Sequence, residues 1–147
     1  MIVIEGPDNS GKSTLAKSLS EILTCPVVHS ERPNPEWGVN QTLLHSYRQL
    51  RPQRAILDRV YAISEYVYGN IVRDGSALGE YHKEALLDLY QRPYLIIYCR
   101  PNTRTILDNQ GREQMEGVLE KHALIVEEYD TLMNEVALHT NLIRYDW

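Results

Sequence analysis

Apolar residues along the chain alternate between short runs and longer stretches with helical spacing. The short runs lie at residues 2–4, 26–29, 54–59, 93–99 and 138–145. Such runs are typical of strands buried in a sheet. The longer stretches repeat apolar residues every three or four positions and lie at 12–23, 40–50, 60–69, 78–91, 102–108 and 113–135. This alternation predicts an α/β fold with a parallel sheet and helices on both faces.

The first short run leads directly into a glycine-rich loop. Gly6 to Ser13 fits G-x-x-x-x-G-K-[ST], the phosphate-binding P-loop, and a helical stretch follows at once. Loop N–H groups and the positive end of that helix converge on one concavity, which suits a polyphosphate. We therefore expect a five-stranded sheet in the order 2-3-1-4-5 with its ligand cleft at the carboxyl ends of the strands. The expected ATP-binding residues are Asn9, Ser10, Gly11, Lys12, Ser13 and Thr14.

Four residues have the most specific expected roles. They are Lys12 and Ser13 of the loop, and Asp58 and Arg59 at the end of the third predicted strand. Lys12 should reach the β- and γ-phosphates of ATP, and the Ser13 hydroxyl should ligate Mg²⁺. The strand at 54–59 ends in Asp58-Arg59. Because the carboxyl ends of the strands line the cleft, Asp58 should lie near Ser13 and hold Mg²⁺, directly or through water, while Arg59 faces the cleft.

Other polar residues near the predicted strand ends leave alternatives open. Arg32 lies in a proline-containing loop after the second strand, so it is either an anion ligand or a solvated loop arginine. Ser64 and Tyr68 follow the third strand and are candidates for packing on a flat base, although a tyrosine stripe also suits a core. Arg73 is a further substrate-binding candidate. Arg100 follows the fourth predicted strand, where it either binds phosphate or has only a structural role.

Composition and charge narrow the classes of function. A chain of 147 residues predicts one domain with a core of its own. The net charge of −5 argues against broad non-specific binding to nucleic acid. Cys25 and Cys99 lack the spacing of a metal site, which favours reduced thiols. No apolar run reaches transmembrane length and no signal peptide is evident, so we expect a cytoplasmic protein without membrane partners.

Three segments follow a more selective pattern than the P-loop alone. Residues 4–14 match E-G-x-D-x-x-G-K-[ST]-T, with Asp8 at the acidic position. Residues 58–69 match D-R-x-x-x-x-S-E-x-V-Y-G, and residues 112–118 are similar to a segment that follows a lid. Together they resemble the thymidylate kinase-like branch of P-loop nucleoside monophosphate kinases, and most of all the small deoxynucleoside monophosphate kinases of bacteriophages.

The resemblance implies a P-loop NTPase three-layer sandwich as a single domain over residues 1–147, with a short lid around 104–113. It implies that Asp8 lies near the 3′-hydroxyl of an acceptor nucleotide and that Arg59 binds the acceptor phosphate. Arg104 and Arg112 would frame the lid over the phosphates of the donor. Residues 30–33 are similar to the family's R-E-P loop, but the order Glu-Arg-Pro differs, so the role of Arg32 stays open. A phage protein would act in the host cytoplasm.

We therefore expect a kinase that moves the γ-phosphoryl group of ATP to a deoxynucleoside 5′-monophosphate, with Mg²⁺ as cofactor and dTMP as the leading acceptor. The expected catalytic residues are Lys12, Asp8, Arg59, Arg104 and Arg112. Two alternatives stay open. A kinase of nucleic-acid ends or modified bases is disfavoured by the net acidity. A non-catalytic nucleotide-binding module is disfavoured by the number of arginines at site positions. A homodimer is compatible with the sequence.

Overall fold

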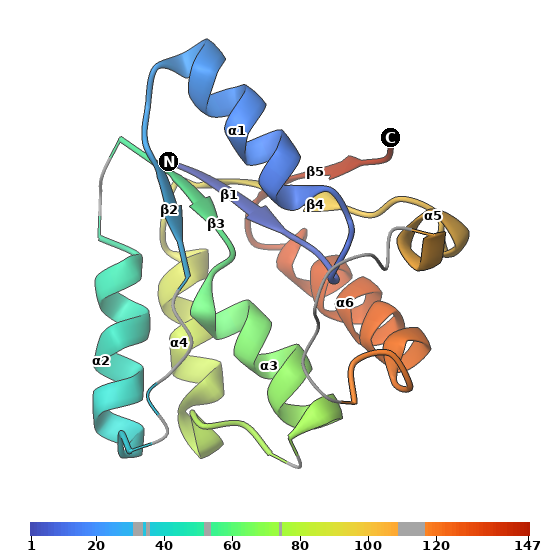
Figure 1. The fold of residues 1–147 in the computed structure, drawn as a ribbon. Helices are drawn as coiled ribbons and strands as arrows, with labels where there is room; N and C mark the ends of the chain where they lie inside the picture. The colour runs from blue at the N-terminus through green and yellow to red at the C-terminus, as the bar shows by residue number, and fades with distance from the viewer. Residues whose placement is uncertain (31–33, 35, 52–53, 74, 109–116) are drawn as a thin grey trace.

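One parallel sheet organises the protein (Figure 1). The structure is a computed structural model, and it describes residues 1–30, 34, 36–51, 54–73, 75–108 and 117–147. The strands are β1 (Ile2–Glu5), β2 (Val27–His29), β3 (Ile56–Asp58), β4 (Leu95–Cys99) and β5 (Asn141–Tyr145). Their spatial order, β2-β3-β1-β4-β5, confirms the order predicted from the sequence.

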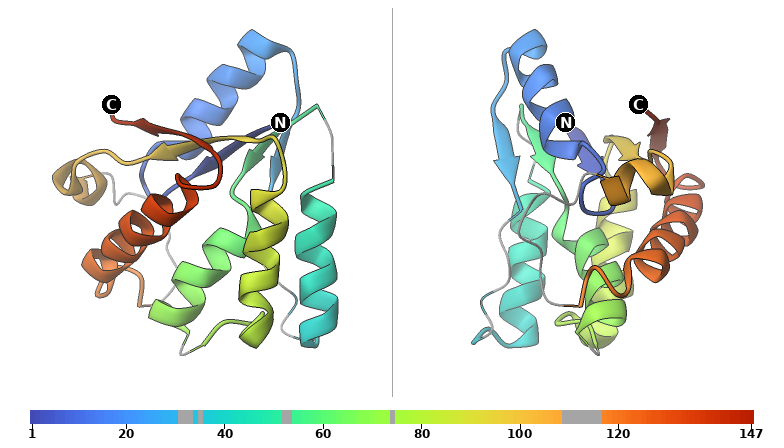
Figure 2. Two further views of the ribbon diagram at one scale, coloured as in Figure 1. Left: turned by 180° about the vertical axis from the view of Figure 1, so that it is seen from behind. Right: turned by 45° about the vertical axis from the view of Figure 1, so that its right-hand side comes forward.

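Helices cover both faces of this sheet, as the sequence pattern predicts (Figures 1 and 2). One face carries α1 (Lys12–Leu23), which packs through Ala16 onto Ile4 and Ile56. The other face carries the larger apolar core, to which Val3, Leu57 and Ile96 contribute from three neighbouring strands. The helices on this side are α2 (Val39–Gln49), α3 (Tyr61–Val72), α4 (His82–Tyr90) and α6 (His122–Val136). The short helix α5 (Thr103–Asp108) follows β4.

Helix α3, which follows β3, is deeply buried along most of its length. Its buried residues lie on all sides of the helix, as is typical of a helix enclosed by neighbours, and are Tyr61, Ala62, Ile63, Glu65, Val67, Tyr68 and Gly69. It contacts α4 and α6, and two residues separate its first residue from the end of β3. The start of α3 therefore lies at the carboxyl edge of the sheet, beside the P-loop.

Two helix boundaries differ from the sequence prediction because of glycines with positive φ. In the described part of the stretch predicted as a helix from residue 113, residues 117–121 form a turn in which Gly117 has a φ of +81°, and the helix α6 begins at His122. Residues 113–116 lie outside the described part. Likewise, the helix predicted from residue 78 opens with a 3₁₀ turn, η1 (Gly79–Tyr81), at a Gly79 φ of +54°. Left-handed backbone is incompatible with the interior of an α-helix.

Two apolar residues of the predicted helical stretches 12–23 and 40–50 are exposed. Ile22 is 74% exposed in the last turn of α1, which extends past the strands (Figure 1). Leu44 is 46% exposed, and α2 instead buries Thr42 and Ser46 on the side that faces α3 and α4. None of the helices in the described ranges combines the length and hydropathy that a membrane crossing requires.

Candidate functional site

The loop between β1 and α1 adopts the tight backbone path expected of a phosphate-binding loop. Gly6, Asn9 and Gly11 all have positive φ angles, of 145°, 61° and 82°. A Cβ on Gly6 would lie 2.4 Å from the carbonyl oxygen of Cys99, so only glycine fits where the loop passes the end of β4. Gly11 is the residue that precedes α1, so the loop ends at the positive end of that helix.

Lys12 folds back into this loop. Its Nζ donates hydrogen bonds to the carbonyl oxygen of Pro7 at 2.5 Å and to the hydroxyl oxygen of Ser10 at 3.4 Å. Burial, and after it the neighbouring Arg59 guanidinium, lower the pKa of Lys12 to about 8, although the carboxylates of Asp8, Glu5 and Asp58 oppose the shift. A bound anion would favour the charged ammonium of Lys12.

Ser13 and Asp58 lie side by side at the start of α1, where the sequence placed them. The Ser13 hydroxyl donates to Oδ2 of Asp58 at 3.0 Å, and the Asp58 side chain is buried. A hydroxyl and a carboxylate oxygen are hard donors of the kind that Mg²⁺ prefers. The two residues therefore fit the predicted magnesium site, although the metal itself stays a prediction.

Arg59 forms the centre of a second polar group beside the loop. It pairs with Asp8, donates to the Tyr129 hydroxyl at 3.0 Å and to the Tyr68 hydroxyl at 3.2 Å, and stacks over the Tyr68 ring at 5.0 Å. Its φ is +75°, which is strained for a residue with a side chain. The structure thus brings together Asp8, Arg59 and Tyr68, three of the predicted site residues from two segments of the chain.

Glu5 is a polar residue to which the sequence analysis assigned no role. It ends β1 and is fully buried, and its carboxylate accepts hydrogen bonds from the N–H groups of Val60 and Gly6 and from the Tyr129 hydroxyl. Burial raises the pKa of Glu5 to about 7, although Arg59 opposes the shift. The signal in the sequence is a charged residue at the end of an otherwise apolar strand.

Glu5 should make stability depend on pH. Its pKa in the folded protein, about 7, lies above the ordinary value of 4.5, so the folded state binds this proton more tightly than the unfolded state. The resulting stabilisation is complete below about pH 4.5 and is lost as the pH rises through about 7. Relative to Glu5→Gln, the wild type should lose on the order of 3 kcal/mol of unfolding free energy across this window. Urea unfolding of both proteins at several pH values measures the difference; parallel profiles would contradict it.

The contact between Trp147 and the P-loop is another feature that the sequence did not predict. Its indole N–H donates to the carbonyl oxygen of Ser10 at 2.9 Å, and its ring lies against Gly11. A Cβ on Gly11 would come within 2.6 Å of the indole nitrogen. The segment after β5 therefore supports the P-loop from a position 137 residues away in the sequence.

Two of the other predicted substrate-binding residues have internal partners. The Ser64 hydroxyl donates to the backbone oxygens of Val60 and Tyr61, within and just before α3. Arg73 pairs with the buried Glu65, whose carboxylate also accepts from the Ala77 N–H. Arg73 follows the end of α3 opposite to the one that adjoins β3, so the structure does not gather it with the P-loop. The substrate-binding roles of Ser64 and Arg73 remain predictions.

The predicted lid is described only in part. Arg104 lies on α5 with 91% of its side chain exposed and its nearest acidic partner, Asp108, at 3.8 Å. The structure therefore does not bring Arg104 into the group around Lys12. Arg112, residues 109–113 of the lid and Arg32 lie outside the described residues.

Arg100 has a structural contact rather than a free side chain. Its Nε and Nη2 atoms bind both carboxylate oxygens of Asp130 at 3.0–3.1 Å, and the Tyr98 hydroxyl donates to the same carboxylate. Such a two-pronged pair fixes the end of β4 against α6. Of the two roles left open for Arg100, the structure favours the structural one.

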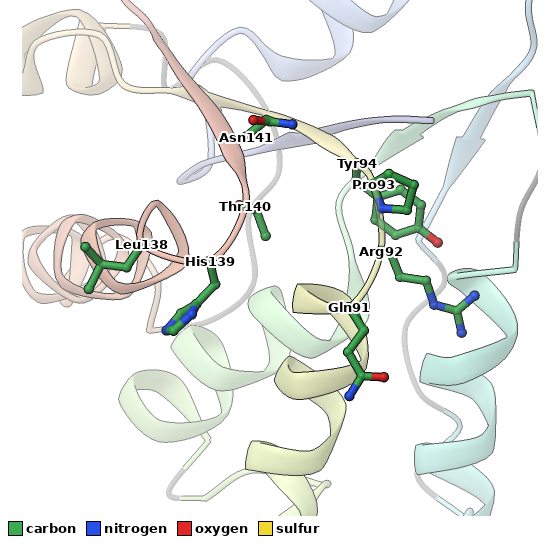
Figure 3. A pocket seen from close by; sticks show the side chains of 8 residues that line it. All are labelled: Gln91, Arg92, Pro93, Tyr94, Leu138, His139, Thr140 and Asn141. Carbon is green, nitrogen blue, oxygen red and sulfur yellow. The ribbon is translucent and has the colours of Figure 1, made fainter.

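A shallow pocket of about 480 Å³ lies at the amino ends of β4 and β5 (Figure 3). It is lined by residues 91–94, just before β4, and residues 138–141, at the start of β5. Since the P-loop, Asp58 and Arg59 lie at the carboxyl ends of the strands, this pocket is separate from the candidate site.

Comparison with known proteins supports the fold. No protein-family model matches the chain. The SPbeta prophage-derived protein YorR of Bacillus subtilis (strain 168) is 28% identical over 151 residues, which cover 100% of this chain and 87% of YorR. The crystal structure of YorR aligns with a TM-score of 0.71 and 25% identity over 99% of this chain and 84% of that chain.

Two further solved structures are similar in fold at lower identity. Deoxyadenosine kinase from M. mycoides aligns with a TM-score of 0.63 and 18% identity over 99% of this chain and 88% of that chain. Thymidylate kinase from Candida albicans aligns with a TM-score of 0.62 and 18% identity over 99% of this chain and 83% of that chain. The chain therefore has a P-loop kinase fold.

Proposed function

We propose that the protein is a nucleotide kinase that transfers the γ-phosphoryl group of ATP to a deoxynucleoside 5′-monophosphate. One observation carries this proposal: Lys12, the Ser13–Asp58 pair and the Asp8–Arg59 pair gather at one edge of the sheet from separate segments. The first two suit the phosphates of a donor nucleotide, and the third suits a second, separate phosphate ester. YorR supports a nucleotide substrate, because its crystal structure is a complex with phosphorylated GDP.

The donor side of the site would act mainly through charge. Loop N–H groups from residues 9–14 would bind the phosphates, and Lys12 would leave its contacts with Pro7 and Ser10 to meet the transferring group. Ser13 and Asp58 would hold Mg²⁺, which neutralises charge on the phosphate oxygens when it is bound. Arg104 and Arg112 would add positive charge from the lid.

The acceptor side would use Arg59 and Asp8. The acceptor phosphate would replace Asp8 as the partner of the Arg59 guanidinium, and Asp8 would then accept a hydrogen bond from the 3′-hydroxyl of the sugar. Tyr68 already stacks on Arg59 and would stay beside the acceptor, with Ser64, Arg73 and Arg32 as the remaining proposed contacts. Phosphoryl transfer to a phosphate oxygen needs little covalent help, so Asp8 orients the acceptor rather than acting as a base.

The identity of the acceptor base is the finer part of the proposal. The resemblance to thymidylate kinases makes dTMP the leading acceptor. The complex of YorR with phosphorylated GDP makes dGMP the first competitor to include. Deoxyadenosine belongs in the same panel, because a protein with this fold is a deoxyadenosine kinase.

Free monophosphates should be distinguished from nucleic-acid ends through Asp8. A free 3′-hydroxyl can donate to the Asp8 carboxylate, whereas in a dinucleotide the same oxygen carries a negatively charged phosphodiester. We expect a deoxynucleoside monophosphate to react about 10–100-fold faster than its 3′-deoxy analogue, the value of one charge-assisted hydrogen bond. A 5′-phosphorylated dinucleotide should hardly react. ADP release with the three acceptors at equal concentration measures these rates.

Asp8→Ala is the matched variant for this test and should react with the monophosphate and its 3′-deoxy analogue at similar rates. Unchanged discrimination in Asp8→Ala would reduce Asp8 to a structural partner of Arg59. Equal wild-type rates for monophosphate and dinucleotide would favour a kinase of nucleic-acid ends. Nucleotide binding without turnover of any acceptor would favour a non-catalytic binding module.

A further inference from the structure

We propose that His29 is a positioning residue for the divalent ion of the bound nucleotide, because it holds the Asp58 carboxylate in a fixed orientation. The inference rests on the proposed function, which gives Asp58 its role as an ion ligand. His29 ends β2 and was not among the residues singled out from the sequence. Its Nδ1 lies 3.0 Å from Oδ2 of Asp58.

The sheet register brings the two side chains together. His29 is the direct partner of Asp58 in the parallel β2–β3 pair, so both side chains leave the sheet on the same face. Ile4 of β1 is the next residue in this row, and it packs on the α1 side of the sheet. The contact between His29 and Asp58 is therefore a consequence of strand pairing and not of a flexible surface loop.

The backbone on both sides of this contact is fixed by hydrogen bonds. The N–H of Ser30 donates to the carbonyl oxygen of Asp58 at 3.0 Å, which continues the strand pairing beyond His29. The Ser30 hydroxyl accepts a hydrogen bond from Nε2 of Gln49 at 2.9 Å, which ties this point to α2. An imidazole on such a support can orient its partner precisely.

In the described part of the structure, both hydrogen bonds to the Asp58 carboxylate are on one oxygen, Oδ2. Because carboxylate oxygens only accept, both His29 Nδ1 and the Ser13 hydroxyl donate to Oδ2. Among the residues that the structure describes, none donates to Oδ1. The two donors would restrain rotation of the carboxylate and leave Oδ1 for the ion or its water ligands. Because the Ser13 hydroxyl donates its hydrogen to Asp58, the lone pairs of its oxygen remain available to the ion.

The exposure of the two side chains indicates which one directs the other. Asp58 is 7% exposed and lies inside the site, whereas His29 is 69% exposed and reaches Asp58 from the solvent side. Replacing His29 should therefore disturb the fold little while it frees the carboxylate. Residues that orient a metal ligand in this way typically contribute about 10–100-fold to metal affinity.

Two variants distinguish the Nδ1 contact from the presence of a side chain. The amide nitrogen of asparagine can occupy the position of the imidazole Nδ1, whereas the longer glutamine places its amide nearer to the position of Nε2. The experiment measures the affinity of Mn²⁺ for the protein–ADP complex from the free Mn²⁺ signal in electron paramagnetic resonance. It uses wild type, His29→Asn, His29→Gln and His29→Ala. Melting curves without ion check the fold of each variant.

We expect His29→Ala and His29→Gln to weaken Mn²⁺ binding about 10-fold or more, and His29→Asn to stay within about threefold of wild type. In activity assays, His29→Ala should need more Mg²⁺ to reach half-maximal rate and should approach the wild-type kcat at saturating Mg²⁺. Mn²⁺ affinity that is equal in all four proteins would overturn the proposal. So would a fall in kcat at saturating Mg²⁺ without a change in ion affinity, because His29 would then act on the phosphates.

The ion measurement needs no acceptor, so it separates this inference from the proposed function. Tight Mn²⁺–ADP binding that depends on His29, in a protein that phosphorylates no acceptor, would support the role of His29 and contradict the kinase. The absence of Mn²⁺–ADP binding in the wild type would overturn both.

Discussion

Replacing Lys12 with alanine should lower kcat by about 10²–10³-fold, because single contacts to charge that develops in the transition state are worth about 3–4 kcal/mol. Lys12 is buried, and its ammonium already lies within the loop on the oxygens of Pro7 and Ser10. Lys12→Arg should fail as well, because the planar guanidinium does not fit where a compact ammonium fits.

Lys17→Ala is the matched control for this prediction. Lys17 belongs to the same helix and is exposed, so its loss should leave kcat within about twofold of wild type. ADP release at saturating ATP and acceptor gives kcat, and circular dichroism shows whether each variant keeps its helices. Lys12→Ala with activity within about tenfold of wild type would remove the catalytic role from the P-loop.

Replacing Arg59 with lysine or alanine should lower kcat/KM for the acceptor by about 10²-fold or more, with little change in KM for ATP. The guanidinium uses Nη1 on the Tyr129 hydroxyl and Nη2 on Asp8 and the Tyr68 hydroxyl, so its plane is fixed before any ligand binds. A lysine ammonium cannot hold these partners and also present two parallel N–H groups to a phosphate.

The control for Arg59 is Arg100→Lys, which changes an arginine that also follows a strand. Arg100 binds Asp130 through two nitrogens, so its loss should lower the melting temperature while KM for the acceptor stays unchanged. A fall in kcat/KM that is equal for Arg59→Lys and Arg100→Lys would indicate a general effect on stability. Because Asp8 loses its partner in Arg59→Ala, the Asp8→Ala/Arg59→Ala double variant should show non-additive losses.

Features that depend on chain order could be predicted from the sequence. The strand–loop–helix order around Gly6 to Ser13 and the alternation of strands and helices predicted a parallel sheet with its cleft beside the P-loop, and the expected order β2-β3-β1-β4-β5 is the one that the structure has. The same reasoning placed Asp58 beside Ser13. Asp58 ends one strand, and Ser13 follows the loop at the end of the neighbouring strand, so both lie at the cleft. Connectivity and the right-handed crossover rule restrict such a chain to a few sheet topologies.

Features that depend on contacts between distant segments could not be predicted in the same way. The Trp147–Ser10 hydrogen bond and the His29–Asp58 contact depend on the strand register and on where the chain leaves the sheet. The pKa of Glu5 depends on complete burial, which a single charged letter at the end of a strand does not reveal. Helix α6 begins at His122, after a turn that contains Gly117. The spacing of apolar residues alone cannot predict the backbone conformation of that glycine.

The most direct test of the proposed function is transfer of label from [γ-³²P]ATP to a panel of acceptors, resolved by chromatography. The panel contains the four deoxynucleoside monophosphates, deoxyadenosine and a 5′-phosphorylated dinucleotide, with Lys12→Ala run in parallel. We predict that label appears in a deoxynucleoside diphosphate, with dTMP the best acceptor, and that Lys12→Ala loses this product. Label found only in inorganic phosphate, in deoxyadenosine monophosphate or in the dinucleotide would contradict a monophosphate kinase.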